Sequence, residues 1–241
     1  MQLPTPFEQI GDHIGIALPG GRALFTTRRG GVSEGAYASL NLGRWTDDDA
    51  DAVRRNRSIV AAAVGVPLDV VVQGRQVHGA RVERRAAADG ALEEADGQAT
   101  ATRGLAALVL TADCLPVALI GEQAVAMLHA GWRGLAQGVL EEGVWAVREL
   151  GGEGELQAAI GPGAGGCCYE VGPEVHAAFG HPARQTTIDL KAIAAQRLRA
   201  AGVQEVHDVG LCTMCSDPDL FFSHRRDGGV TGRQAGIAWR S

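Results

Sequence analysis

The hydrophobic residues of this chain fall mainly into short apolar runs, separated by polar and glycine-containing turns. Runs of about four to eight apolar residues bounded by such turns are typical of buried β-strands. They predict strands at residues 14–18, 23–27, 70–73, 80–83, 105–111, 116–120, 124–128, 156–160, 205–209 and 235–239. Helix-like patterning with capping residues predicts helices at residues 49–64, 134–150, 173–178 and 189–201.

The order of these elements indicates the fold class. Strands 105–111, 116–120 and 124–128 are joined by links too short for a crossover helix, so we expect them to pair antiparallel. With helices on both sides of this β-rich middle, the sequence predicts an α+β fold. The expected form is one layered α/β/β/α sandwich over residues 1–241, with mixed, largely antiparallel sheets. The low-complexity stretch 84–97 is expected to be a mobile surface loop.

Composition narrows the functional class. The chain has 241 residues, 46% of them hydrophobic, and a net charge of -6 with a pI near 5.6. This acidic balance argues against a nucleic-acid partner. No apolar stretch is long enough to span a bilayer, and the N-terminus lacks the pattern of a signal peptide, so we expect a cytoplasmic protein. The sequence leaves the oligomeric state open between monomer and homodimer.

Three soft metal ligands stand at the ends of predicted strands. Cys114 follows strand 105–111, His129 follows strand 124–128, and His78 lies in a Gln-Val-His-Gly segment. One thiolate and two imidazoles suit Zn²⁺, and three protein ligands leave a fourth position for water or substrate. The sequence therefore predicts a catalytic rather than a structural zinc site. Cu²⁺ is possible on the same ligands, because its intrinsic affinity is higher.

Several longer motifs resemble those of one known family. They are TTRRGGVSEGAYASLNLG (26–43), NRSIV (56–60), QVHG (76–79), TADCLPV (111–117), HAGWRGL (129–135), IGPGAGGCCYEVG (160–172) and FFSHRRDGGVTGR (221–233). Together they resemble the bacterial laccase-domain family, whose members are also called polyphenol oxidases, purine nucleoside phosphorylases and peptidoglycan editing factors. The resemblance runs from about residue 26 to residue 239. It implies a single-domain α/β/β/α sandwich.

The resemblance also implies functional residues. His78, Cys114 and His129 match the family's ligands for a catalytic zinc, while Asn41 and Arg57 match positions associated with nucleoside binding. The implied activities are cleavage of adenosine, inosine and S-methyl-5'-thioadenosine by phosphate, and deamination of adenosine by water. Purine nucleoside and phosphate are thus the expected partners. His224 and Ala164 depart from the commoner family residues, which leaves substrate detail open.

The two activities need different groups. A zinc deaminase uses a carboxylate beside the metal as proton shuttle, and Asp113 next to Cys114 is the candidate. The alternative is that Asp113 supports the site through hydrogen bonds only. Phosphorolysis needs positive charge and N–H donors near the anion. Arg57, Arg133 and the glycine-rich segment 161–166 are candidates. The alternatives are a solvated helix position for Arg57, a structural ion pair or cap for Arg133, and a tight turn for the glycines.

Three function hypotheses follow. The first is a zinc-dependent purine nucleoside phosphorylase and adenosine deaminase. The second is a metal-dependent amidase that edits misloaded UDP-N-acetylmuramoyl-amino acid precursors of the cell wall. The third is a non-catalytic partner protein that retains a metal for stability. A full multicopper oxidase would need more than the seven histidines present, so a copper-dependent polyphenol oxidase activity would be adventitious.

The remaining eye-catching residues carry weaker predictions. Cys212 and Cys215 form a CxxC motif without a second one to complete a four-cysteine site, and the adjacent pair Cys167 and Cys168 would make a strained disulfide. We expect all four to be packed thiols. Tyr169 and Glu170 are expected near the pocket, and Arg225 and Arg226 could reach an anionic substrate. His176 and His181 are expected at the surface.

Overall fold

The computed structural model describes residues 1–90, 92–151, 154–180 and 186–241. Its twelve strands are β1 (Glu8–Ile10), β2 (His13–Leu18), β3 (Gly21–Phe25), β4 (Val71–Val72), β5 (Val82–Arg84), β6 (Gly97–Thr100), β7 (Ala106–Thr111), β8 (Leu115–Gly121), β9 (Val125–Ala130), β10 (Leu156–Ile160), β11 (Glu205–Asp208) and β12 (Gln234–Arg240). The helices are α1 (Ala50–Val64), α2 (Trp132–Gln137), α3 (Val139–Gly151), α4 (Pro173–Ala178) and α5 (Leu190–Ala200), with short 3-10 turns η1 (Gly35–Tyr37) and η2 (Leu68–Val70).

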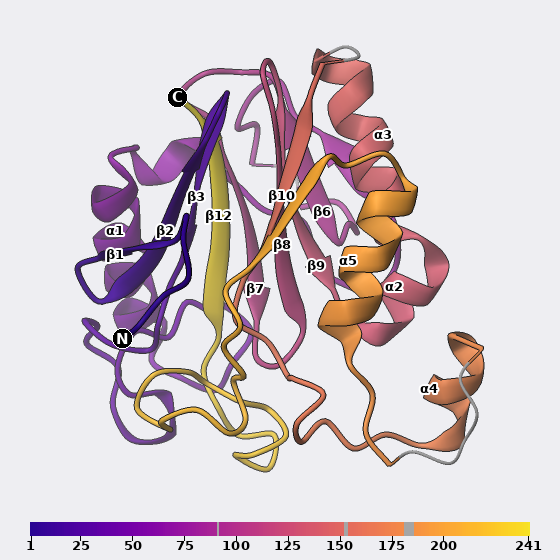
Figure 1. The fold of residues 1–241 in the computed structure, drawn as a ribbon. Coiled ribbons are helices and arrows are strands. Elements are labelled where there is room, and N and C mark those ends of the chain that lie inside the picture. Colours follow the sequence, from indigo (N-terminus) through magenta and orange to yellow (C-terminus); the bar gives the residue numbers. More distant parts are fainter. Residues whose placement is uncertain (91, 152–153, 181–185) are drawn as a thin grey trace.

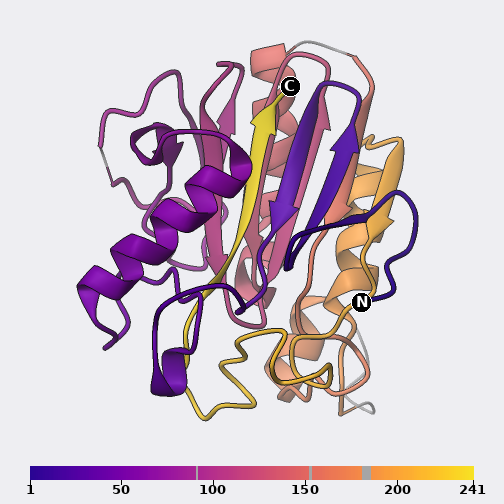
Figure 2. The ribbon, with the colours of Figure 1, turned by 90° about the vertical axis from the view of Figure 1, so that its left-hand side faces the viewer.

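Two six-stranded sheets pack face to face between layers of helix (Figure 1). The first sheet has the order β1-β2-β3-β12-β7-β4, and the second has the order β11-β10-β8-β9-β6-β5. Most neighbouring strands are antiparallel, whereas β4 with β7, β5 with β6 and β10 with β11 are parallel. Figure 2 shows α1 lying across the outer face of the first sheet. The predicted α/β/β/α sandwich is therefore confirmed.

Alternation along the central strands explains why both sheet faces are apolar. In β8, Val117 and Leu119 belong to the core beneath α3 and α5, whereas Ala118 and Ile120 belong to the core between the sheets. Because successive side chains of a strand point to opposite faces, a strand buried on both sides needs a continuous apolar run. The apolar runs in the sequence are thus the central strands of the two stacked sheets.

The prediction that three consecutive strands pair with one another is only partly right. Strands β8 and β9 pair antiparallel as expected, but β7 lies in the other sheet, between β12 and β4. Residues 112–114 carry the chain from one sheet to the next, with Asp113 at a φ of 89°. A short link can make a hairpin or cross between packed sheets, and its length alone does not distinguish the two.

Most helix bounds agree with the sequence, with one correction. Asp49 caps α1 by accepting a hydrogen bond from the Ala52 N–H, and Gly65 ends the helix in the left-handed region. The single helix predicted at 134–150 is instead α2 and α3, which are separated at Gly138. Gly138 has a φ of 95°, a conformation that costs glycine little and interrupts a helix.

The expectation for the 84–97 stretch is wrong at its C-terminal end. Ala95 and Asp96 are fully buried, and β6, which was not predicted, begins at Gly97. His176 is also buried rather than at the surface, while His181 lies outside the described residues. Within the described part of the chain, no helix has the length and apolar character that a transmembrane segment requires.

Candidate metal centre and its surroundings

The three predicted metal ligands come together although they lie in separate segments. His78 lies between β4 and β5, Cys114 lies in the link between β7 and β8, and His129 lies in β9. Their ligand atoms all lie within 4.8 Å of one another, and the two imidazole rings meet edge to face at 4.9 Å. His129 is buried whereas His78 is exposed, so the cluster has a buried floor and one open side.

Asp96 holds this cluster together from within the protein. One of its carboxylate oxygens lies 2.8 Å from Nδ1 of His129 and also accepts the His78 backbone N–H at 2.9 Å. The other accepts the N–H groups of Val77 and Gly79. Asp96 therefore directs a protonated Nδ1 of His129 toward itself and leaves Nε2 available as a ligand. It also secures the turn in which His78 adopts a φ of 60°.

Opposite charges stabilise one another within the cluster. Burial by itself raises the pKa of the Cys114 thiol, but His129 and His78 lower it to about 6. Burial lowers the pKa of His129, yet Cys114 and Asp96 outweigh burial and raise it to about 9. Burial raises the pKa of the Asp96 carboxyl, and His129 with the backbone donors brings it below its usual value. Cys114 is therefore poised as a thiolate, the form that binds metals.

The space around the ligands suits a metal ion. Gly131, which follows His129 in the chain, leaves open a position where a Cβ atom would lie 2.9 Å from the Cys114 Sγ and 3.2 Å from the His78 ring. A side chain at that position would intrude on the ligands. One thiolate and two imidazoles with a carboxylate behind one of them form a donor set suited to Zn²⁺. These residues fit the predicted metal.

Cationic and aromatic side chains lie near the ligand cluster. Burial raises the pKa of the Tyr169 phenol, as do the nearby Cys114 and Asp113, whereas Arg225 and Arg133 lower it. Tyr169 therefore lies within electrostatic range of both the ligand cluster and two arginines. The Arg225 guanidinium lies 5.2 Å from the centre of the Tyr169 ring. Tyr169 also packs against the core beneath α3 and α5, so its place in a substrate pocket stays a prediction.

Arg233 is a further cation near the cluster. Burial lowers the pKa of its guanidinium, while Cys114, Asp113 and Tyr37 raise it. This residue was not singled out from the sequence, because a lone arginine at the end of a glycine-rich motif is also typical of a solvated turn. Asp96 was missed for a different reason: it ends a charged, low-complexity stretch that resembles an exposed loop.

Asp113 makes contacts that support neighbouring loops. One carboxylate oxygen accepts the Thr213 hydroxyl at 2.7 Å, and the other accepts the Arg225 backbone N–H at 2.8 Å. The side chain is buried. These hydrogen bonds fix the segments that carry Thr213 and Arg225 next to Cys114, which is the structural alternative to a proton shuttle.

Asn41 and Arg57 also make internal contacts. Asn41 is fully buried, donates to Thr46 and Asp48, and accepts the backbone N–H groups of Gly43 and Arg233. It thereby positions the backbone of Arg233 and has no surface to offer a ligand directly.

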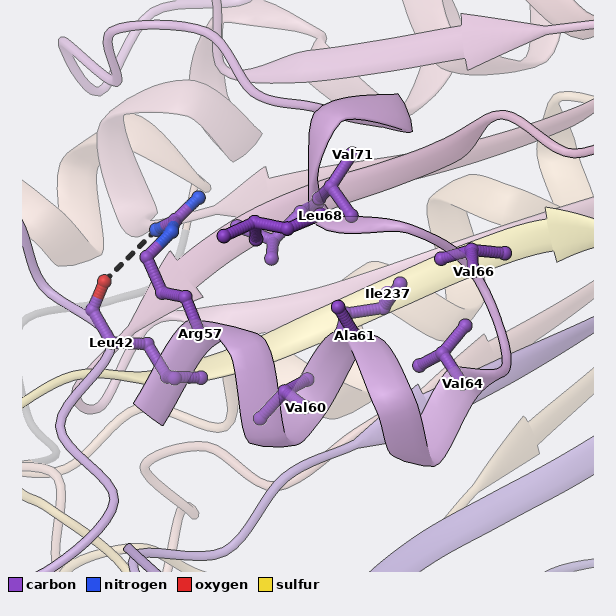
Figure 3. Close-up of a pocket in the computed structure, with 10 residues that line it drawn as sticks. Leu42, Arg57, Val60, Ala61, Val64, Val66, Leu68, Val71 and Ile237 are labelled. Atoms are coloured by element: carbon purple, nitrogen blue, oxygen red, sulfur yellow. Dashed lines mark hydrogen bonds between the residues drawn. The ribbon is translucent and has the colours of Figure 1, made fainter. Parts of the chain in front are cut away.

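Arg57 lies on the buried face of α1 and donates to the Leu42 carbonyl oxygen (Figure 3). It also donates to the Gln73 side chain. Burial, and then the nearby Arg44, lower the pKa of Arg57 to about 9. The hydrophobic side chains around it belong to the packing of α1 on the first sheet. Its two hydrogen bonds therefore connect α1 with the segments that carry Leu42 and Gln73.

The glycine-rich segment 161–166 does not form an anion cradle. The N–H groups of Gly161, Gly163 and Ala164 donate to the carbonyl oxygens of Pro116, Leu211 and Asp113. The Gly165 N–H points to the Cys212 sulfur at 3.3 Å. Since these donors already have partners, the segment fits the alternative of a tight structural turn.

The four remaining cysteines form a second group. The thiols of Cys167, Cys168, Cys212 and Cys215, here called the four-thiol cluster, lie within 4.8 Å of one another. The expectation of packed thiols is wrong for Cys167 and Cys215, which are exposed. The two cysteines of the CxxC motif lie next to the adjacent cysteines Cys167 and Cys168, and not next to a second CxxC motif. A sequence criterion that requires two CxxC motifs therefore misses this cluster. Within the described residues, these two groups are the sets of His, Cys, Asp and Glu that could hold a metal.

Comparison with known proteins identifies the family. A family model described as multi-copper polyphenol oxidoreductase laccase matches residues 22–241. The chain therefore belongs to this laccase-like family, as the motifs indicated.

Its relatives carry a more specific name. A protein of Corynebacterium glutamicum named purine nucleoside phosphorylase is 40% identical over 234 residues, covering 90% of this chain and 94% of the relative. One of Mycobacterium tuberculosis with the same name is 41% identical over 233 residues, covering 90% and 91%.

Solved structures share the fold. A Neisseria meningitidis protein matches with a TM-score of 0.84 at 39% identity, covering 95% of this chain and 99% of that one. YlmD of Geobacillus stearothermophilus matches with a TM-score of 0.89 at 33% identity, covering 98% and 99%.

Proposed function

We propose that this chain is a zinc-dependent purine nucleoside enzyme. Its proposed reactions are the cleavage of adenosine, inosine and S-methyl-5'-thioadenosine by phosphate and the hydrolytic deamination of adenosine. One observation carries the proposal: His78, Cys114 and His129 cluster together, and Tyr169, Arg133, Arg225 and Arg233, here called the rim, lie near this cluster. The names of the relatives, which are purine nucleoside phosphorylases, support the same substrate class.

His78, Cys114 and His129 would hold the metal. Zinc bound there would supply a Lewis acid next to the substrate. The role of Asp96 is to keep His129 in the tautomer and orientation that present Nε2 to the ligand position. The role of Gly131 is to leave the space beside Cys114 free. The thiolate of Cys114 is favoured by its two histidine neighbours.

The arginines of the rim suit a phosphate nucleophile. In phosphorolysis, a phosphate oxygen forms a bond to C1' of the ribose while the bond from C1' to the purine nitrogen breaks, and the purine leaves after gaining a proton. Arg133, Arg225 and Arg233 offer the positive charge that binds and orients the phosphate. The ring of Tyr169 offers a face on which a purine can stack.

Asn41, Arg57 and Asp113 receive positioning roles in this proposal. Asn41 holds the backbone of Arg233, Asp113 holds the backbone of Arg225, and Arg57 anchors α1 to the segment that carries Leu42. We assign the direct contact with phosphate to Arg133, Arg225 and Arg233, because Arg133 and Arg225 are exposed and Arg233 is half-buried, whereas Arg57 is buried. The five free thiols would persist in a reducing compartment, which supports a cytoplasmic location.

Phosphate dependence tests the proposal. Purified protein is incubated with adenosine, inosine or S-methyl-5'-thioadenosine, with and without phosphate, and free base and ribose 1-phosphate are measured. We expect base release to require phosphate and conversion of adenosine to inosine to proceed without it. Cys114→Ala should abolish both reactions, lower the zinc content by one ion per chain and preserve a cooperative melt. A chain of this size can bury enough apolar surface to fold without that metal.

Two other outcomes would contradict this proposal and favour a different enzyme. Turnover of UDP-N-acetylmuramoyl-serine in water, without any turnover of nucleosides, would favour the amidase. Oxidation of phenols that requires added copper and consumes oxygen, again without nucleoside turnover, would favour a polyphenol oxidase.

A further inference from the structure

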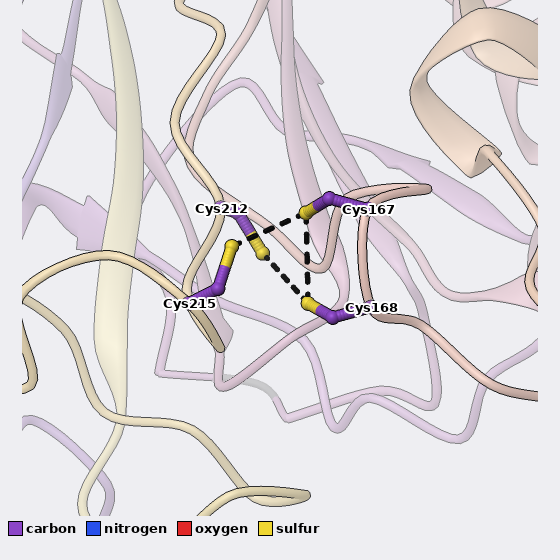
Figure 4. Close-up of side chains that lie close together, drawn as sticks. All are labelled: Cys167, Cys168, Cys212 and Cys215. Atoms are coloured by element: carbon purple, nitrogen blue, oxygen red, sulfur yellow. Dashed lines mark hydrogen bonds between the residues drawn. The ribbon is translucent and has the colours of Figure 1, made fainter.

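Two cysteine-bearing segments leave the second sheet side by side. Cys167 and Cys168 follow β10, and Cys212 and Cys215 follow β11. The four side chains point toward one another (Figure 4). Strands β10 and β11 are parallel neighbours, so the chain leaves both at the same end of the sheet. This topology brings together two cysteine pairs that are more than forty residues apart in the sequence.

The spacing of the sulfurs suits a single metal ion. The Sγ–Sγ distances are 3.2 Å between Cys167 and Cys215, 3.4 Å between Cys168 and Cys212, and 3.6 Å between Cys167 and Cys168. Zinc–sulfur bonds of about 2.3 Å in a tetrahedron place the ligand sulfurs about 3.8 Å apart. Disulfide sulfurs are separated by about 2.05 Å, and all four thiols are free. Ligands of a polynuclear iron–sulfur cluster would have to stand further apart.

The backbone around the cluster is prepared for thiolate ligands. The Gly165 N–H donates to the Cys212 sulfur at 3.3 Å. Gly163 pairs with the other segment in both directions, donating to Leu211 and accepting from Thr213. A Cβ atom on Gly165 would lie 3.1 Å from the Cys167 sulfur, so the turn brings its backbone close to the thiols.

The four-thiol cluster is accessible to a metal ion. Cys167 and Cys215 are exposed, and Cys167 and Cys212 line a cavity of about 310 Å³. Lys191 lines the same cavity, but its ammonium is paired with Asp208 at 3.2 Å and donates to the Leu211 carbonyl oxygen at 2.8 Å. The site thus has an entry path for a cation.

We propose that the four-thiol cluster binds one Zn²⁺ as a closed structural site. Tetrahedral all-sulfur coordination is typical of structural zinc, since no position stays open for substrate. The proposal rests on the geometry of the cysteines and is independent of the function proposed for the first centre.

The proposed zinc would clamp two segments that border the first centre. Tyr169 follows Cys168 directly, and Thr213, which donates to Asp113, follows Cys212 directly. Joining the two cysteine pairs therefore restrains Tyr169 and the Asp113 side chain together. The four-thiol cluster is accordingly a positioning element for the rim of the first centre, not a catalytic site.

Metal content tests this proposal directly. Protein produced with zinc and purified without chelator is analysed by elemental analysis and native mass spectrometry. We expect two zinc ions per chain in the parent protein, one in Cys114→Ala and one in the double variant Cys212→Ser/Cys215→Ser. Met214→Leu, which changes one of the two residues between these cysteines and conserves its volume, is the matched control and should retain two.

Cobalt provides an independent readout. With Co²⁺ in place of zinc, Cys114→Ala should show the intense thiolate-to-cobalt absorption of a four-sulfur tetrahedral site, and further loss of Cys212 and Cys215 should remove it. EDTA should lower the melting temperature of Cys114→Ala but not that of the variant lacking Cys114, Cys212 and Cys215.

Two results would overturn the proposal. Folded Cys114→Ala protein without zinc would do so, and so would a parent protein whose intact mass is lower by four hydrogens, because that indicates two disulfides. Since Cys114→Ala leaves the four-thiol cluster intact, the test holds even if the double variant does not fold.

Discussion

The two ligand clusters are supported in different ways. In the first centre, each ligand comes from a separate segment, and one buried carboxylate, Asp96, holds two of them. In the four-thiol cluster, the ligands come in two close pairs, and backbone hydrogen bonds hold their segments. A centre built around a buried charge is sensitive to a residue that is not itself a ligand. A centre built on backbone geometry depends mainly on the ligands themselves.

Removing the Asp96 carboxylate is expected to have the largest effect on the difference between the two centres. Asp96→Ala leaves His129 and three backbone N–H groups without their acceptor. Loss of such a partner typically costs 10–100-fold in metal affinity. Breaking a buried ion pair from one side costs about 3–5 kcal/mol of stability. Chelator competition and chemical denaturation measure the two effects.

The control for Asp96→Ala is an exposed carboxylate. Asp51→Ala removes a surface ion pair with Arg54 and should change stability by less than about 1 kcal/mol. The Asp96→Ala protein should keep the zinc of the four-thiol cluster. Loss of both metals with an intact fold would show that the clusters are not supported independently.

Arg233 and Arg57 test the difference between direct contact with phosphate and support of the surrounding structure. Arg233→Ala should lower kcat/KM for phosphate-dependent base release by about one to two decades, which corresponds to about 1.5–3 kcal/mol for a charged hydrogen bond. Its zinc content should not change.

Arg57→Ala is the matched comparison for Arg233→Ala. It removes buried hydrogen bonds to Leu42 and Gln73, so we expect a stability loss of about 1.5–3 kcal/mol. Steady-state kinetics per folded molecule should stay close to the parent values. If Arg57→Ala instead reduced turnover as much as Arg233→Ala without destabilising the protein, Arg57 would regain a direct role in catalysis.

Two glycine substitutions test how closely the backbone packs against the ligands of the first centre. In Gly131→Ala the new methyl group would lie 2.9 Å from the Cys114 sulfur, so the ligands must shift, and we expect zinc affinity to fall on the order of tenfold. Gly79→Ala, beside His78, meets atoms no nearer than 3.6 Å and serves as the control. Equal affinities in the two variants would contradict a tightly fitted ligand set.

The smallest expected effect concerns pH. In protein freed of metal by chelation, alkylation of Cys114 should rise with pH through about 6, because its histidine neighbours lower the thiol pKa from an ordinary value of 9.0. The thiolate gains population as pH increases, so the rate should level off near neutrality. His129→Ala should move the midpoint upward, and mass spectrometry of the labelled peptide measures it. An unchanged midpoint would remove His129 as the cause.

The sequence by itself determined the features that depend on neighbours along the chain. The apolar runs of β8 and β9 mark strands buried on two faces, and the caps Asp49 and Gly65 mark the ends of α1. His78, Cys114 and His129 could also be proposed as ligands from the sequence, because each is a soft donor beside a predicted strand. The spacing of these segments along the sequence could not show which other residues, such as Asp96, support the three ligands.

Only the tertiary structure decided the features that depend on packing between distant segments. It placed β7 and β8 in different sheets, brought Asp96 beneath His129, and joined an adjacent cysteine pair to a CxxC motif. Each of these contacts joins residues that are far apart in the sequence. They form because the packing of the two sheets against each other fixes where the connecting segments meet. That packing depends on the apolar surface buried by the whole core, which no local sequence pattern encodes.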